Sequence, residues 1–150
     1  MKFAIKLLAM LVIVLTFGAN SSLAQSQGKS CSTEVIDCVS GGIGQSEREA
    51  LLNQSSKYNF WLTTAGSKSG AYLSEVQVTI RDVRSGARVF FNTMDGPWLF
   101  ANLPPGNYEV EARYRENDTA PVQVVKKITS IQKGQHRQMM LYFNVASESD

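Results

Sequence analysis

Residues 95–110 read DGPWLFANLPPGNYEV, a short apolar run with a turn signal at each end, followed by an alternating stretch. The Asp95-Gly96 pair is typical of a tight hairpin turn, and Pro104-Pro105-Gly106 ends the apolar run and redirects the chain. From Tyr108 to Tyr114, apolar and charged residues alternate with the period of a strand that has one buried face. These residues therefore predict two consecutive strands joined by a proline-glycine turn.

The same pattern of short alternating runs between turn residues extends in both directions along the chain. It predicts seven strands at a spacing of about 8–12 residues, which is typical of an all-β antiparallel sandwich. Before them, Ser46 and Glu49 have the spacing of a capping box and predict a short helix over residues 47–54, with Leu51 and Leu52 packing inward. The seven predicted strands cover residues 58–64, 75–82, 87–93, 98–103, 108–114, 122–131 and 137–145.

The first 24 residues have the pattern of a secretory signal peptide, with Lys2 and Lys6 before an apolar run and Ser22 and Ala24 before a cleavage site. The apolar run, residues 7–19, would span about 20 Å as a helix, short of the ~30 Å hydrocarbon core of a bilayer. We therefore expect cleavage after residue 24 and an exported protein, periplasmic or secreted, with no remaining membrane span. The expected organisation is a signal peptide over residues 1–24, a disulfide-tied arm and short helix over 25–57, and a sandwich domain over 58–146.

Cys31 and Cys38 are the two cysteines of the chain. In an oxidising compartment such a pair is expected to form a disulfide. The alternative is a metal site, which needs at least two further ligands. Only Glu34 and Asp37 lie nearby, and carboxylates suit thiolate-binding metals poorly. We expect the disulfide, and no metal or other cofactor.

Charge and composition argue against several classes of function. Cleavage after residue 24 removes Lys2 and Lys6, so 13 of the 15 basic residues remain against 13 acidic ones, and the net charge is zero. A nucleic-acid-binding protein needs a basic surface, so nucleic acid is not an expected partner. The single histidine, His136, and the two cysteines argue against most metal and acid–base enzymes, and we expect a protein that is not an enzyme.

Two groups of residues resemble catalytic or metal sites, and strand geometry argues against both. Glu109 and Glu111 face the same way about 7 Å apart, a spacing found in glycosidase pairs, but they alternate with apolar residues as a solvated sheet face does. His136, Met139 and Met140 are side chains of the kind that bind copper. Along a strand, however, His136 and Met140 would lie about 13 Å apart, and Met139 would point to the opposite face.

Residues 119–147 contain no acidic residue but four basic ones, Lys126, Lys127, Lys133 and Arg137. They fall on the last two predicted strands, which we expect to form a hairpin around Lys133-Gly134. Two interpretations stay open. The lysines protect an edge hairpin from aggregation, or the four residues form a binding patch for an anionic envelope polymer or an acidic partner.

The motif in residues 95–110 resembles that of carboxypeptidase regulatory-like domains and their collagen-adhesin B-type relatives, which are transthyretin-like (prealbumin-like) sandwiches. The resemblance implies a Greek-key sandwich over residues 58–145, with Trp98, Phe100 and Leu103 entering the core before a strand that opens with Tyr108. It implies no peptidase activity, because the zinc ligands of those peptidases belong to another domain. The related hydroxyisourate hydrolases use several histidines and a C-terminal Tyr-Arg-Gly-Ser, neither of which this chain has.

Members of that family have binding, spacing or structural roles, sometimes toward carbohydrate. The resemblance therefore implies a noncatalytic binding or structural module of a bacterial cell envelope, with carbohydrate or another anionic envelope component as the candidate ligand. The candidate contacts are the loop of residues 66–72 and the four basic residues. The alternative is an accessory subunit that docks on another exported protein by strand addition.

Overall fold

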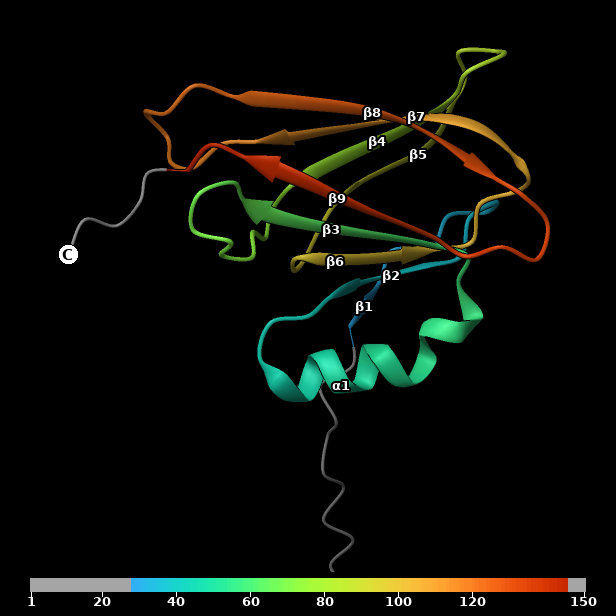
Figure 1. Ribbon diagram of the computed structural model, residues 1–150, viewed down its shortest axis with the longest axis horizontal. Helices are drawn as coiled ribbons and strands as arrows, with labels where there is room; N and C mark the ends of the chain where they lie inside the picture. The colour runs from blue at the N-terminus through green and yellow to red at the C-terminus, as the bar shows by residue number, and fades with distance from the viewer. Residues whose placement is uncertain (1–27, 146–150) are drawn as a thin grey trace, which may run out of the picture.

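The computed structural model describes residues 28–145, which form nine strands and one α-helix (Figure 1). The predicted signal peptide, residues 1–24, lies outside the described residues. In chain order, the strands are β1 (Lys29–Ser30), β2 (Cys38–Gly41), β3 (Phe60–Gly66), β4 (Gln77–Asp82), β5 (Arg88–Thr93), β6 (Trp98–Ala101), β7 (Gly106–Tyr114), β8 (Gln123–Ile131) and β9 (Arg137–Phe143).

The strands form two facing sheets, which confirms the predicted all-β sandwich. The five-stranded sheet has the order β1-β2-β6-β3-β9, and the four-stranded sheet has the order β5-β4-β7-β8. The helix α1 (Gln45–Gln54), followed by a 3₁₀ turn over Ser55–Lys57, lies against the outer face of the five-stranded sheet (Figure 1). The order of layers is therefore four-stranded sheet, five-stranded sheet, helix.

The main core lies between the sheets and is built from alternate residues of each strand. In the four-stranded sheet, Val78 and Ile80 of β4 lie opposite Ala112 and Val110 of β7, and all four are fully buried. A period of two places these residues on one face of the sheet, as the alternation in the sequence predicts. The five-stranded sheet covers them from the other side with Phe60, Leu62, Leu99, Ala101, Leu141 and Phe143.

The sandwich has nine strands in its described part rather than the predicted seven. All seven predicted strands are present, with ends within two residues of the predicted ones. The additional strands, β1 and β2, come from residues 25–57, which were expected to form a disulfide-tied arm and a short helix. β2 pairs with β6, and its four residues are all buried, so they show no alternation that would reveal a strand.

The prediction of a wholly antiparallel sandwich is wrong at β9. This strand pairs in parallel with β3 over seven residue pairs. The expected final hairpin is also wrong, because β8 and β9 belong to opposite sheets. The turn at Lys133-Gly134 carries the chain from the edge of one sheet to the edge of the other. Alternation cannot distinguish these arrangements, since both place the same residues inward.

The start of α1 differs from the predicted capping box. Neither Ser46 nor Glu49 caps the helix. Instead, the carboxylate of Glu47 accepts hydrogen bonds from the backbone amides of Gly42 at 3.1 Å and Ile43 at 2.7 Å. These amides belong to the loop before the helix, so Glu47 holds that loop against the first turn, where a carboxylate also interacts favourably with the helix dipole.

The helix covers only part of the outer face of the five-stranded sheet. Leu51 packs there with Val39, Tyr58 and Phe100 in a second, smaller core. Leu52, which was also expected to pack inward, is 50% exposed. No helix within residues 28–145 has the length and apolar character needed to cross a bilayer. The rest of the outer sheet face is open beside α1.

Candidate binding groove

Cys31 and Cys38 form a disulfide across the connection between β1 and β2, with their Cα atoms 5.1 Å apart. Ile36, inside this connection, is fully buried in the main core. The disulfide occupies both sulfur atoms, which answers the question left open between a disulfide and a thiolate metal site. Within the described residues, no group of three or more His, Cys, Asp or Glu side chains is placed to hold a metal ion. A disulfide fits an oxidising compartment.

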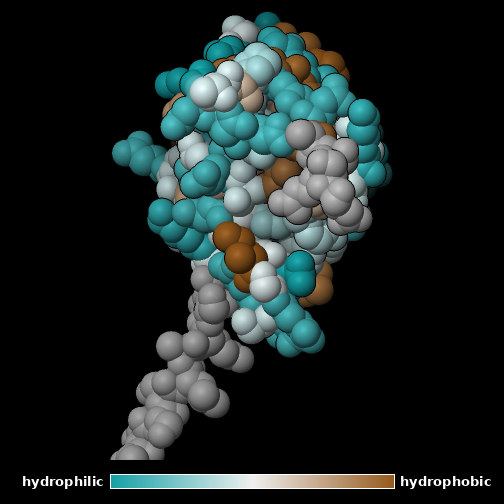
Figure 2. All heavy atoms as spheres, turned by 90° about the vertical axis from the view of Figure 1, so that its left-hand side faces the viewer, coloured by the Kyte–Doolittle hydropathy of each residue, from teal (hydrophilic) through white to brown (hydrophobic). Residues whose placement is uncertain are grey.

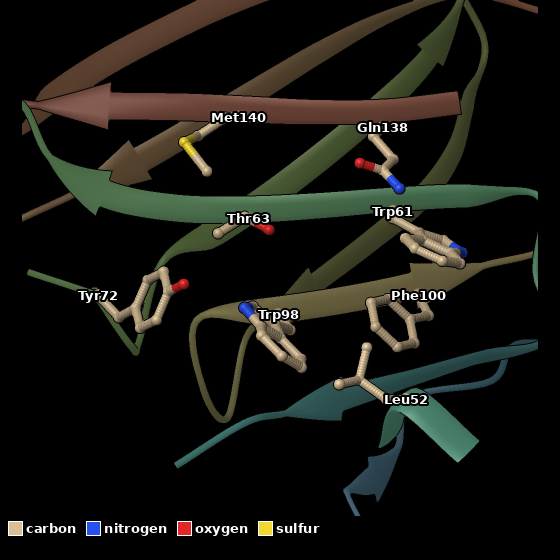
Figure 3. Close-up of a pocket in the computed structure, with 8 residues that line it drawn as sticks. All are labelled: Leu52, Trp61, Thr63, Tyr72, Trp98, Phe100, Gln138 and Met140. Atoms are coloured by element: carbon tan, nitrogen blue, oxygen red, sulfur yellow. The ribbon is translucent and has the colours of Figure 1, made fainter. Parts of the chain in front are cut away.

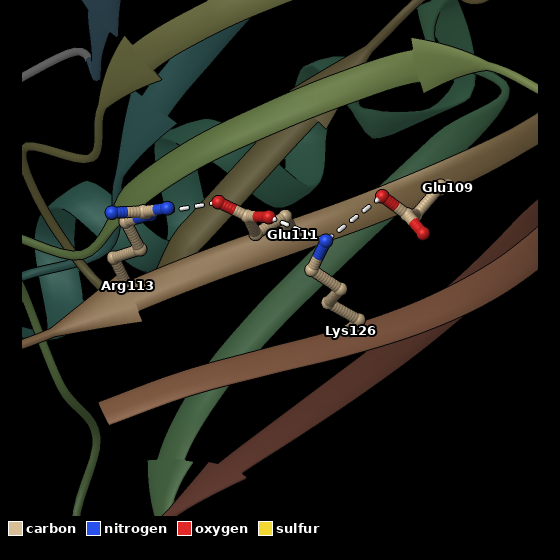
Figure 4. A network of polar contacts seen from close by, with 4 residues as sticks. All are labelled: Glu109, Glu111, Arg113 and Lys126. Atoms are coloured by element: carbon tan, nitrogen blue, oxygen red, sulfur yellow. Dashed lines mark hydrogen bonds and ion pairs between the residues drawn. The ribbon is translucent and has the colours of Figure 1, made fainter. Parts of the chain in front are cut away.

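The outer face of β7 carries a network of ion pairs (Figure 4). Glu111 contacts Lys126 at 2.8 Å and Arg113 at 2.7 Å, and Lys126 also reaches Glu109 at 3.3 Å. The hydrogen bond from Lys126, followed by that from Arg113, lowers the pKa of the Glu111 carboxyl. Both carboxylates therefore belong to a network of ion pairs on the solvent-facing side of the sheet.

Lys127 and Arg137 face the seam where β8 of one sheet meets β9 of the other. The Lys127 ammonium donates to the carbonyl oxygen of Met140 at 3.0 Å, and Nε of Arg137 donates to the carbonyl oxygen of Ser130 at 3.4 Å. Lys133 lies exposed in the turn between the strands. The four predicted patch residues, which include Lys126 on the outer face, are therefore divided among three places. Lys127 and Arg137 line one hollow together.

The family resemblance implies that four residues of the motif enter one core, but the structure divides them between two sites. Leu103 and Tyr108 lie in the main core, and burial raises the pKa of the Tyr108 hydroxyl. Trp98 and Phe100 face away from that core, onto the outer face of the sheet beside α1. Leu99, between them, is the residue that enters the space between the sheets.

Strand register builds a grid of six side chains on this outer face (Figure 3). Neighbours in a row of the grid are separated by the strand spacing of about 4.8 Å. Thr63 is the one small side chain of the six, and a hollow of about 190 Å³ opens above it, with Tyr72 and Leu52 as further walls. We name this hollow the aromatic groove. One row of its floor is Trp98, Thr63 and Met140, and the next is Phe100, Trp61 and Gln138.

The rings of the aromatic groove form a continuous apolar surface. Trp98 and Phe100 stack with their centres 6.0 Å apart and their planes at 22°, and Phe100 lies 5.2 Å from Trp61. Tyr72 meets Trp98 edge-on, at 6.4 Å and 78°. Phe100 is buried, whereas Trp61 and Trp98 are half-buried and Tyr72 is exposed. A ligand can therefore reach three of the four rings.

Two of the six floor side chains, Thr63 and Gln138, are polar. Thr63 contributes a hydroxyl and Gln138 an amide. In Figure 3, the Gln138 amide projects above Trp61, and the indole nitrogen of Trp98 lies on the side of Thr63 and Tyr72. Ligand sites in proteins commonly combine an apolar, aromatic lining with a few polar groups that orient the ligand. The aromatic groove has this composition.

Two connections wall the groove at one end of the sandwich. The predicted contact loop of residues 66–72 contributes Tyr72, which is held by a β-bridge to Ala65. On the other side, Gly42 has a φ of +96°, and a Cβ atom there would lie 3.3 Å from the Trp98 ring, so glycine lets this loop pass close to Trp98. The surface at this end is mainly hydrophilic, with hydrophobic atoms in small separate patches (Figure 2).

His136, Met139 and Met140 do not converge on one point. Met139 packs against the main core, while Met140 lines the aromatic groove on the opposite face of the sheet. Nδ1 of His136 lies 2.8 Å from the carbonyl oxygen of Tyr58, and its ring centre lies 6.2 Å from that of Trp61. His136 therefore packs beside the groove residues rather than toward Met139.

Sequence reasoning did not identify the aromatic groove. β3 reads FWLTTAG and β6 reads WLFA, so both strands carry apolar or aromatic residues on both of their alternating faces. Such a strand is covered on both sides or presents one face to a ligand. The signal available in the sequence was a tryptophan directly before a leucine in each strand, at Trp61-Leu62 and Trp98-Leu99, which indicates large apolar side chains on both faces. Assigning Trp98 and Phe100 to the sandwich core concealed them.

Comparison with known protein families, with curated proteins and with solved structures finds no match to this chain. Function is therefore argued from the aromatic groove itself.

Proposed function

We propose that this chain is a noncatalytic carbohydrate-binding module that uses the aromatic groove. The proposal depends on one observation: three accessible rings, those of Trp61, Trp98 and Tyr72, surround a small hollow that also has polar side chains on its floor. The C–H faces of a sugar ring are apolar and carry partial positive charge, so they pack on the negative face of an aromatic ring. Sugar hydroxyls need hydrogen-bonding partners, which Thr63 and Gln138 supply.

The wider setting of the proposal follows from the sequence. Export by the signal peptide of residues 1–24 would deliver the module to a bacterial periplasm or to the medium. The Cys31–Cys38 disulfide supports an oxidising compartment. The two-sheet core supports a distant relationship to the Greek-key, carboxypeptidase regulatory-like sandwiches. Binding alone accounts for the groove, so we propose no enzymatic activity.

The test compares two exposed aromatic residues of similar accessibility. Tyr72→Ala removes a wall of the groove, whereas Phe91→Ala removes a ring from β5 in the other sheet; the two are 49% and 46% exposed. We expect Tyr72→Ala to weaken binding about three- to tenfold, because a ring contact contributes about 0.5–1.5 kcal/mol. Phe91→Ala should leave it unchanged. Calorimetric titration with neutral and acidic oligosaccharides measures both, and thermal melting checks that the variants are folded.

Three results would contradict the proposal. The protein binds no oligosaccharide of the panel, or the two variants lose binding equally, or the protein cleaves the sugar that it binds. An assay for new reducing ends during the titration detects such cleavage.

Strand addition is the second candidate function, and the open edge of β5 favours it. Within the described residues, β5 pairs with β4 alone. The last strand, β9, is a less available edge. Lys127 donates to the Met140 carbonyl oxygen, and the Gln123 side chain makes hydrogen bonds of 2.6 and 2.8 Å with the Asn144 backbone. A purified exported partner that slows amide exchange in β5, without glycan, would support this function.

A further inference from the structure

The aromatic groove is the middle of a longer track across the five-stranded sheet. On one side, Tyr72 also lines a hollow of about 270 Å³ that contains Arg48 and the loop of residues 42–44. On the other side, Gln138 and Met140 also line a hollow of about 390 Å³ in the seam between β8 and β9. The shared residues make the three hollows consecutive, and we name them together the track.

The length of the track favours a chain over a single sugar. It crosses β6, β3 and β9, which span about 10 Å at the usual strand spacing before either flanking hollow is counted. A monosaccharide seated on the aromatic groove would leave both flanking hollows empty. Several linked sugar units would occupy all three.

Positive charge lies at both ends of the track. Arg48 lines the hollow next to α1, and Lys127 and Arg137 line the seam hollow. Among the described residues that line the three hollows there is no Asp or Glu. In residues 28–145, none of the three cations forms an ion pair with a carboxylate. Their charge is therefore available to an anionic ligand.

Arg48 is held in position at its end of the track. Its guanidinium carbon lies 5.9 Å from the centre of the Tyr72 ring, a cation–π arrangement that leaves the N–H groups at its edge free to donate. The adjacent carboxylate of Glu47 is bound to the amides of Gly42 and Ile43 and stays with that loop. A planar guanidinium binds a carboxylate through two parallel hydrogen bonds, so Arg48 suits a carboxylate ligand.

Lys127 and Arg137 are held in the seam by neutral acceptors. Each donates one hydrogen bond to a backbone carbonyl oxygen, which fixes the side chain without cancelling its charge. An ammonium group carries three N–H donors and a guanidinium carries five. The remaining donors of both residues can therefore bind an anionic group on a ligand that enters the seam.

We propose that the ligand is an acidic polysaccharide whose sugar rings carry carboxylate groups. Its chain lies across the strands, with rings on the aromatic groove and carboxylates at Arg48 on one side and at Lys127 and Arg137 on the other. This inference rests on the proposed carbohydrate-binding function and specifies its ligand. The aromatic groove selects for sugar rings, and the two cationic ends select for acidic ones.

The test compares polymers that carry free carboxylates with polymers in which the carboxylates are masked. Polygalacturonate and alginate are compared with their methyl-esterified forms, and poly-L-glutamate serves as a polyanion without sugar rings. We expect at least one acidic polysaccharide to bind about tenfold or more tightly than its ester, because charge-assisted hydrogen bonds to a carboxylate are lost on esterification. Rising salt should weaken this preference. Titration calorimetry measures each affinity.

Matched arginine variants locate the effect. Arg48→Gln and Arg137→Gln should each reduce the preference for the acidic form about three- to tenfold, with little change in binding of the ester. Arg84→Gln removes the same charge from the exposed β4–β5 turn and should change nothing. Thermal melting of all three variants separates loss of a contact from loss of folding.

The outcomes distinguish the two proposals. Equal binding of acid and ester overturns the acidic ligand but leaves carbohydrate binding intact. Equal binding of poly-L-glutamate and the acidic polysaccharides overturns it as well, because charge alone would then explain the affinity. If neither the acids nor the esters bind, the acidic ligand is overturned, and carbohydrate binding fails with it when the neutral oligosaccharides of the first titration do not bind either. An acid preference that survives Arg48→Gln and Arg137→Gln overturns the placement of the chain along the track.

Discussion

Thr63 occupies the centre of the first row of the groove floor, between Trp98 on β6 and Met140 on β9. Its side chain is much smaller than either neighbour, and the space above it is the hollow of about 190 Å³. A large residue here would extend the aromatic surface without interruption and leave no recess for a ligand. The depth of the groove therefore depends on one residue.

Thr63→Leu should abolish the recess while leaving the fold intact. The added methyl groups occupy the space that a sugar ring would enter, so we expect affinity for oligosaccharides to fall about tenfold or more through steric exclusion. The melting temperature should stay close to that of the wild-type protein because the position faces the open groove. The matched control is Thr93→Leu on β5, which lies outside the groove. Unchanged affinity in Thr63→Leu would show that the ligand lies elsewhere.

Glu111 links the ion pairs on the outer face of β7 and should contribute a pH-dependent part of the stability. The hydrogen bond that it accepts from Lys126 and, with a smaller effect, the one from Arg113 hold the pKa of its carboxyl below the ordinary value of 4.5. Folding therefore favours the ionised form. The resulting stability is present above pH 4.5 and is lost as the pH falls through the lowered pKa of the folded state.

Glu111→Gln should consequently reduce the free energy of unfolding at neutral pH but not in strong acid. Urea unfolding of both proteins across the acidic range measures the difference, which should shrink to zero as the wild-type carboxyl becomes protonated. Glu34→Gln, in the exposed β1–β2 connection, is the control. A Glu111→Gln effect that is the same at all pH values would show that the ion pairs do not contribute.

At the scale of elements, the short strands of the arm depend on their covalent link. β1 has two residues and β2 has four, and the connection between them places Ile36 in the main core. β2 in turn pairs with β6, which carries Trp98 and Phe100 of the groove floor. The disulfide thus supports the strand beside the groove as well as the edge of the sheet.

Reduction of the Cys31–Cys38 disulfide should lower the free energy of unfolding by roughly 2–2.5 kcal/mol, the loop-entropy contribution of a short closed loop. Urea unfolding with and without a thiol reductant measures this change. A Cys31→Ala/Cys38→Ala variant should be less stable than the oxidised protein and insensitive to the reductant. Equal stability of oxidised and reduced protein would show that strand pairing alone holds the arm.

Comparison of the strands also shows which features the sequence patterns predict and which they miss. Alternation in β4 and β7 predicts their buried residues, such as Val78 and Val110, because one face of each strand is buried and the other is in water. β2 was missed because all four of its residues are buried, which removes the alternation on which the prediction depends. β3 was predicted, but the part that its outward-facing residues such as Trp61 play in lining the aromatic groove was not.

At the scale of the whole molecule, the assignment of strands to sheets decides where the site lies. β8 and β9 are consecutive in the chain, yet they form the edges of opposite sheets, and β9 pairs in parallel with β3. This arrangement brings Met140 and Gln138 beside Thr63 and Trp61. A final hairpin would instead have placed them next to β8, on another sheet, and the groove would not exist.

The amino-acid sequence by itself determined the positions of seven of the nine strands within residues 28–145, the inward faces of most of them, the turns and the cysteine pair that forms the disulfide. Each of these depends on neighbours along the chain: a period of two, a glycine or proline at a turn, two cysteines in a short loop. The tertiary structure alone decided the parallel pairing of β9, the separation of the four basic residues and the meeting of Trp98, Thr63 and Met140. Those features depend on which strands lie side by side, and strand neighbours are chosen by packing of the whole core rather than by local pattern.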